Sequence, residues 1–143
     1  MTPPEHKASA ERRGRIVRGI WAACLLLAGL NHARTLLQHG VLWDYHGVGG
    51  VSAAYWSSLT VIDPLIAVLL LVRPRIGVPA ALLVISTNVA HNLAVTTRRL
   101  PEGALFGYVA SSPQLLSQIA FLIFVVVTWR WARIATISCS RAT

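Results

Sequence analysis

The chain has 143 residues, of which 55% are hydrophobic and 13% charged, and its mean hydropathy is +0.58. A soluble domain carries about 25% charged residues, so this composition excludes a disordered chain and disfavours a soluble globular domain. The net charge of +8 does not indicate nucleic-acid binding, because the basic residues flank apolar runs instead of forming a stripe with aromatic residues between them.

Four apolar stretches are long enough to cross a bilayer core as helices, which takes roughly 20 residues each. They cover residues 16–37, 55–72, 76–95 and 113–131. The sequence therefore predicts an all-α, polytopic membrane four-helix bundle, with its membrane domain over residues 15–133. Residues 1–14 are polar and basic and are predicted to be a disordered tail. Residues 134–143 are predicted to form a cytoplasmic tail.

Lys and Arg in the short flanks predict the orientation, because they stay on the cytoplasmic side of a membrane. They gather near the N-terminus, at Arg73-Pro74-Arg75 and in the C-terminal tail, whereas residues 38–54 contain none. Both termini are therefore predicted to be cytoplasmic (N-in/C-in), in a multi-pass protein of a prokaryotic inner membrane. Arg34, Arg98 and Arg99 lie on the predicted outer side and depart from the rule.

Polar residues fall at overlapping depth in the four spans. In the third span Asn88, His91 and Asn92 stand at i, i+3 and i+4, which predicts a shared helix face. The polar residues at similar height in the other spans are Asn31, His32, Thr60, Gln114, Ser117 and Gln118. Because polar groups in hydrocarbon need partners, these faces are predicted to turn inward and form a pocket in the outer half of the bundle. The alternative is that they only link the helices through hydrogen bonds.

Asp63 is the one acidic residue inside a span, near the predicted midplane of the membrane. Inserting an acidic side chain at this depth costs about 2.5–3.5 kcal/mol. Asp63 should therefore pair with another group, take up a proton or bind a cation. Pro64 follows directly and is expected to kink the helix. We expect Asp63 to anchor a ligand and, if the protein is an enzyme, to act with His91 as its acid/base pair. A salt bridge from Asp63 to Arg34 or His91 is the structural alternative.

Histidines and tryptophans allow further interpretations. His32 and His91 with Asp63 would match a two-histidine, one-carboxylate metal site, and the two histidines alone would match the axial ligands of a haem. Similar depth alone supports these readings, so no metal ligand is assigned and the cofactor stays open. His39 and His46, in the loop of residues 38–54, are expected to be solvated, although this Gly-rich loop could fold back as a lid. The tryptophans, Trp21 included, are expected to anchor the membrane interface.

Two families resemble this chain. Its size, four spans and polar first helix are similar to those of the DoxX-like membrane proteins. It also resembles the EXPERA superfamily, which includes the emopamil-binding sterol isomerases and the sigma-two receptor, at Leu30-Asn31-His32, Asp63-Pro64-Leu65 and Asn88-Val89-Ala90-His91. The EXPERA resemblance implies a ligand cavity between the helices. Its isomerases use more than one buried acid, whereas this chain has one within a span, so ligand binding is the function implied.

The sequence thus predicts an integral membrane protein whose pocket binds a lipidic or small amphipathic ligand. One alternative is a structural or assembly subunit of a membrane complex. The other is a small proton-coupled transporter that works as a homodimer, with Asp63 carrying the proton. A membrane lipid or an amphipathic small molecule is the expected partner, and nucleic acid is not.

Overall fold

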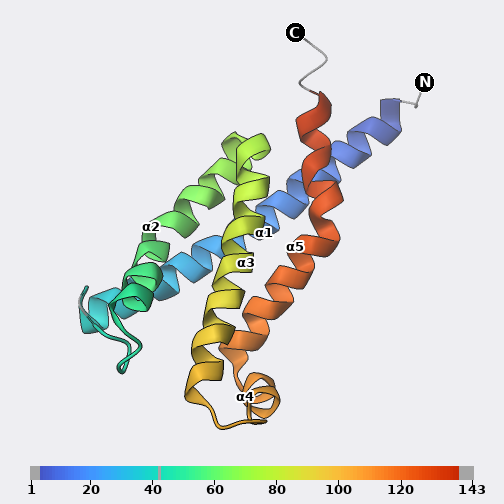
Figure 1. The fold of residues 1–143 in the computed structure, drawn as a ribbon. Helices are drawn as coiled ribbons and strands as arrows, with labels where there is room; N and C mark the ends of the chain where they lie inside the picture. Colours follow the sequence, from blue (N-terminus) through green and yellow to red (C-terminus); the bar gives the residue numbers. More distant parts are fainter. Residues whose placement is uncertain (1–3, 42, 139–143) are drawn as a thin grey trace.

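The computed structural model describes residues 4–41 and 43–138, and within these ranges it contains helices and no strand. The helices are α1 (Pro4–His39), α2 (Gly50–Val72), α3 (Pro74–Arg99), α4 (Leu105–Ser111) and α5 (Pro113–Ser138) (Figure 1). Four of them, α1, α2, α3 and α5, contain stretches long and apolar enough to cross a membrane. The prediction of a helical bundle with four long apolar helices, compatible with a membrane protein, is therefore confirmed.

The helices extend beyond the predicted spans. Because α1 begins at Pro4, residues 4–14 are helical where disorder was expected, and residues 1–3 lie outside the described residues. Proline is favoured at the first helical position, and the Ala, Glu, Lys and Arg that follow are good helix formers. The short helix α4 lies between the third and fourth predicted spans. At the other end α5 continues to Ser138, beyond the predicted span.

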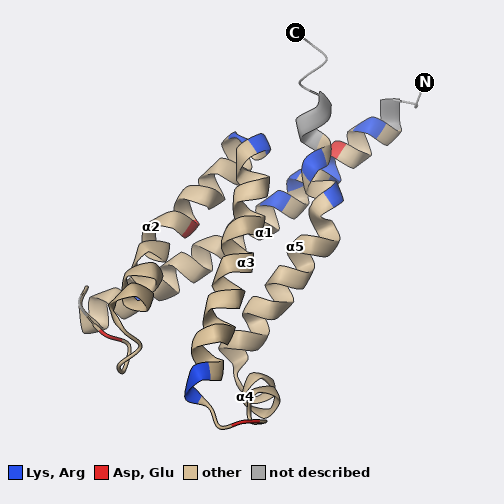
Figure 2. Ribbon diagram, viewed as in Figure 1, with Lys and Arg blue, Asp and Glu red and all other residues tan. Residues whose placement is uncertain are grey.

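The four long helices form a ring in which each packs against two neighbours. Helix α1 packs against α2 and α5, and α3 packs against the same two, whereas α1 and α3 scarcely touch. Both termini and the α2–α3 turn lie at one end of the bundle, and the α1–α2 loop and α4 lie at the other (Figure 1). Lys and Arg gather at the first end, with a smaller group at the second (Figure 2). This distribution is the one from which the N-in/C-in orientation was predicted, and the orientation stays a prediction.

Helices α2 and α3 form a tight hairpin. Arg73 alone separates them, and Pro74 begins α3, where its missing N–H costs no helical hydrogen bond. At Gly77 the two backbones approach so closely that an added Cβ would meet the backbone of Leu69 and Leu70. A glycine is therefore required at this position for the hairpin to pack.

Helices α1 and α5 cross near the termini. Arg18 lies buried there, and its Nη1 donates a hydrogen bond of 3.0 Å to the carbonyl of Ala132. Trp21 is 0% exposed, and its Nε1 donates to Oγ1 of Thr128 at 3.0 Å. The expectation that Trp21 anchors the membrane interface is therefore wrong, because its position on α1 faces α5 instead of lipid.

Candidate functional site

A cavity of about 530 Å³ lies between α1, α3 and α5, with one lining residue from α2. On α1 its lining starts at Cys24, three residues after Trp21, which bonds α5. Figure 1 shows α1 and α5 separating beyond their crossing. We call it the deep cavity; its polar lining residues are Asn31, His32, Asp63, Asn88, Gln114, Ser117 and Gln118. Leu27 on α1 is 67% exposed, and Ser117 on α5 is also exposed. The deep cavity is therefore open at the cleft between these two helices.

Asp63 reaches the deep cavity because α1 and α2 approach each other closely at Gly29. A Cβ on Gly29 would lie 2.9 Å from Cδ of Pro64 and 3.5 Å from Cβ of Asp63. Asp63 is 2% exposed, and within residues 4–41 and 43–138 no side chain or backbone group forms a hydrogen bond or ion pair with it. The salt bridge to Arg34 or His91 considered above is thus not formed. The carboxyl group faces the cavity with its hydrogen-bonding capacity unused.

His91 does not join Asp63. Its ring packs against Tyr55 at 4.7 Å and against Trp56 at 5.5 Å between centroids, and it lines neither cavity of the bundle. The reason is helical geometry, since consecutive residues point about 100° apart. Asn92 bonds residues of both α2 and α5, whereas the ring of its neighbour His91 packs on α2. The structure therefore does not assemble the predicted acid/base pair.

Two buried polar atoms on the α2–α3 side form no hydrogen bond with any described residue. They are Oγ1 of Thr60 and Nε2 of His91. Thr60 was also predicted to bind the ligand, yet it lines neither cavity. Of the predicted site residues, the structure therefore brings Asn31, His32, Asp63, Asn88 and Gln118 to the deep cavity. Asn92 lines a second cavity, and Thr60 and His91 line neither.

Asn92 links three helices. It accepts a hydrogen bond at Oδ1 from Nε1 of Trp56 at 2.8 Å. Its Nδ2 donates to Oε1 of Gln118 at 2.7 Å and to Oδ1 of Asn88 at 3.2 Å. Because its amide is fully engaged within the protein, the interpretation of Asn92 as a link between helices fits the structure better than a role in ligand binding.

Replacing Asn92 with alanine should therefore destabilise the bundle. The change removes the partners of Trp56, Gln118 and Asn88, and we expect a loss of about 1–3 kcal/mol in the free energy of unfolding. Unfolding by denaturing detergent, followed by loss of helicity, measures it. Asn31→Ala is the matched control, because Asn31 is exposed on α1 and its side chain has no bond within the described residues. Equal losses in both variants would show that the network does not hold the helices together.

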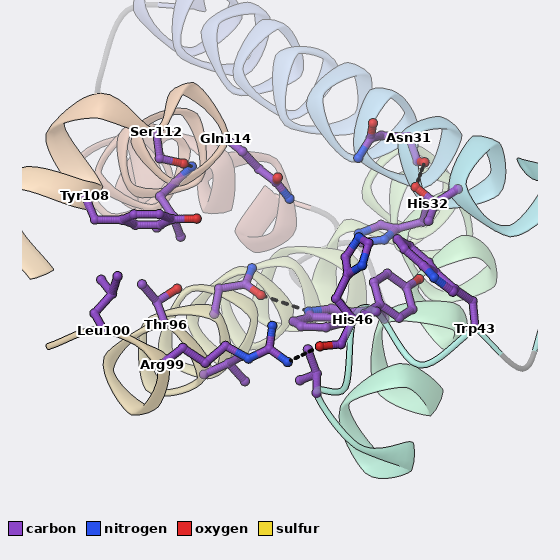
Figure 3. A pocket seen from close by; sticks show the side chains of 17 residues that line it. Asn31, His32, Trp43, His46, Thr96, Arg99, Leu100, Tyr108, Ser112 and Gln114 are labelled. Carbon is purple, nitrogen blue, oxygen red and sulfur yellow. Dashed lines mark hydrogen bonds between the residues drawn. The ribbon is translucent and has the colours of Figure 1, made fainter. Parts of the chain in front are cut away.

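A second cavity of about 420 Å³, which we call the outer chamber, lies toward the loops. Asn31, His32 and Gln114 line both cavities, so the two spaces adjoin at these side chains. Figure 3 shows Asn31 and His32 on one side of the outer chamber, with Arg99 and Thr96 opposite them. The remaining sides come from the α1–α2 loop and from α4 and the start of α5.

The α1–α2 loop folds over the outer chamber, as a lid would. Trp43, Tyr45 and His46 line it, and Tyr45 and His46 adopt φ of 52° and 62°, which is uncommon for residues other than glycine. Nη2 of Arg99 donates to the carbonyl of His46 at 3.0 Å and ties the loop to α3. Trp43, Tyr45 and Arg99 were not predicted as site residues from the sequence. The only signal was the aromatic cluster in a Gly-rich loop.

The two cavities together are suited to hold a molecule with polar groups and an apolar body, as ligand pockets generally are. His32 and Asp63 line the deep cavity without His91, so the two-histidine, one-carboxylate set is not assembled. No group of three His, Cys, Asp or Glu residues able to hold a metal ion occurs in the described part of the chain. Comparison with protein-family models, curated proteins and solved structures gives no match to this chain.

Proposed function

We propose that this protein binds a lipidic or small amphipathic ligand in the deep cavity, with Asp63 as the anchor. The observation that carries the proposal is the Asp63 carboxyl group, which is buried, faces a cavity and has no partner among the described residues. A buried polar group without a hydrogen bond is costly. A hydroxyl or amine group of a ligand in the cavity would remove that cost.

The apolar lining supports an amphipathic ligand. Leu25 and Leu27 of α1, Ile85 of α3 and Phe121 of α5 are among the residues that line the deep cavity. The cleft between α1 and α5 is open at the exposed Leu27. In a membrane this cleft would face acyl chains, so a lipid-like molecule would enter sideways without crossing water. With both termini cytoplasmic, the entrance would lie in the outer leaflet.

Native mass spectrometry of the full chain, released from membranes in a mild detergent, tests the anchor. We expect wild type to retain a bound non-protein mass and Asp63→Asn to lose most of it, because the amide keeps the shape of the side chain but not its charge. Asp44→Asn is the matched control, since Asp44 is exposed in the α1–α2 loop and lines neither cavity. Retention of the same mass by all three proteins would refute Asp63 as the anchor.

A second pair of variants tests the cavity independently of the acid. Ser117→Trp would place an indole ring in the deep cavity and should also abolish the bound mass. Ala120→Trp lies on the same helix, but Ala120 is exposed and lines neither cavity, so it should retain the ligand. Bare wild-type protein, or a co-purifying protein chain in place of a small molecule, would instead favour an assembly subunit of a membrane complex.

A further inference from the structure

We propose that the outer chamber holds an acidic end group, so that the ligand is an amphiphile with a carboxylate or phosphate at its outer end. This inference rests on the proposed function and adds the chemical class of the ligand. It commits to an oxyanion attached to an apolar chain, as opposed to a free anion from solution.

The charges that face the outer chamber are of one sign. Among the described residues that line it, Arg99 is the one permanent cation, His32 and His46 are also present, and there is no Asp or Glu. Arg99 comes from the end of α3, His32 from α1 and His46 from the loop, so three separate segments bring nitrogen donors to one space. Such a lining attracts an anion and disfavours a cation.

The guanidinium of Arg99 has donors to spare. Its only hydrogen bond within the described residues is the one from Nη2 to the carbonyl of His46, and no described carboxylate pairs with it. A guanidinium carries five N–H donors in a planar fork that matches carboxylate and phosphate oxygens. An oxyanion in the outer chamber would engage the remaining donors.

The acidic end and the anchor are far enough apart to define an elongated ligand. Asn88 lines the deep cavity, as Asp63 does, and Arg99 is 11 residues further along the helix of Asn88, which corresponds to a rise of about 16 Å. The two cavities adjoin at Asn31, His32 and Gln114, which line both. One chain with an acid at one end and a hydroxyl group further along fits both ends.

Aromatic side chains line the outer chamber together with Arg99. They are Trp43, Tyr45, Trp56 and Tyr108, and the rings of Trp43 and Tyr45 pack with centroids 4.4 Å apart. Arg99 and Tyr108 are exposed, so the cation lies toward solvent while the rings offer apolar contact to the chain that carries the acid. This combination favours an amphiphile over a free anion.

Calorimetric titration of the delipidated full chain, in an uncharged detergent, tests the inference with three matched probes. They are a long-chain ω-hydroxy fatty acid, its methyl ester, and the fatty acid of equal length without the hydroxyl group. We expect the acid to bind at least about tenfold more tightly than its ester. Removal of the hydroxyl group should weaken binding separately, through Asp63.

Arg99→Gln should abolish the difference in affinity between the acid and its methyl ester, and Arg99→Lys should retain part of that difference. Arg98→Gln is the matched control, because Arg98 is exposed, has the same charge and lines neither cavity. It should leave the difference unchanged. An equal loss in Arg98→Gln and Arg99→Gln would mean that the preference is a general effect of charge at this end of the bundle and would overturn the inference.

The probes also separate this inference from the proposed function. If the hydroxyl group matters but acid and ester bind equally, the outer chamber has no preference for an acid and only the inference fails. If none of the probes binds, both fail. Acetate, added as a free carboxylate, should not compete with the long-chain acid. Competition by acetate at similar concentration would show a site for a soluble anion and would contradict the amphiphile.

Discussion

Trp21→Ala should lower the free energy of unfolding by about 3 kcal/mol or more, which is the lower end of the range for tryptophan in a packed core. The side chain is 0% exposed at the crossing of α1 and α5, and its hydrogen bond to Thr128 would also be lost. In a membrane the loss comes mainly from packing and from the hydrogen bond, because lipid tails are as apolar as the protein interior. Unfolding in a series of denaturing-detergent mixtures measures the change.

Ile20→Ala provides the control for this prediction. Ile20 precedes Trp21 on α1 but is 44% exposed, so its truncation leaves no cavity between the helices and should change stability by less than about 1 kcal/mol. Thr128→Val, which removes the acceptor of the Trp21 bond and the donor to the carbonyl of Phe124 but keeps the side-chain volume, should fall between the two. If Trp21→Ala lowered the free energy of unfolding no more than Ile20→Ala does, the crossing would not be what holds α1 against α5.

Gly77→Ala should lower the free energy of unfolding by about as much as Trp21→Ala, although it adds a single methyl group. The added Cβ would lie 2.5 Å from the carbonyl carbon of Leu69 and 2.6 Å from Cα of Leu70, and backbone atoms of a helix cannot turn aside as a flexible side chain can. Overpacking of a core typically costs about 1–3 kcal/mol. Because α2 must shift away from α3 here, we expect the upper end of this range, measured by the same unfolding assay.

Gly19→Ala is the matched control, since no atom lies within 4 Å of the Cβ position at Gly19 in α1. Alanine favours helix over glycine by about 0.8–1.0 kcal/mol, so this variant should be neutral or more stable than wild type. The two substitutions are chemically identical and should have effects of opposite sign. A neutral Gly77→Ala would show that the α2–α3 hairpin packs less closely than the structure describes.

The crossing near the termini and the site are connected. Helices α1 and α5 are held together where Arg18 and Trp21 contact Ala132 and Thr128, and they separate beyond it. Between α3 and α5 the link is at Asn92 and Gln118. The deep cavity lies between these two fixed points, so the packing that stabilises the bundle also keeps the cleft between α1 and α5 open.

The sequence by itself determined the helical class and the membrane-crossing character of the chain. The long apolar runs allow little else, because a backbone in hydrocarbon must satisfy its own hydrogen bonds. Depth along each span, which follows from a fixed rise per residue, selected eight site residues. The structure places five of them around the deep cavity, namely Asn31, His32, Asp63, Asn88 and Gln118. Depth alone did not separate these five from Thr60, His91 and Asn92, which do not line it.

The tertiary structure decided which way each side chain faces. Asn92 and His91 are adjacent at one depth, yet the first bonds Gln118 of α5 and the second packs on Tyr55 of α2. A rotation of the helix about its own axis would exchange them without changing the depth of either. Likewise, the position of Trp21 in the sequence predicts an interface anchor, whereas the structure buries it against α5.

The outer chamber depends on tertiary structure most of all. Trp43 and His46 come from a loop, and Arg99 from the end of a helix more than fifty positions further along the chain. No periodic pattern relates such positions, because the spacing of a helix constrains only residues within that helix. Only the folding of the loop over the bundle brings them to the same space.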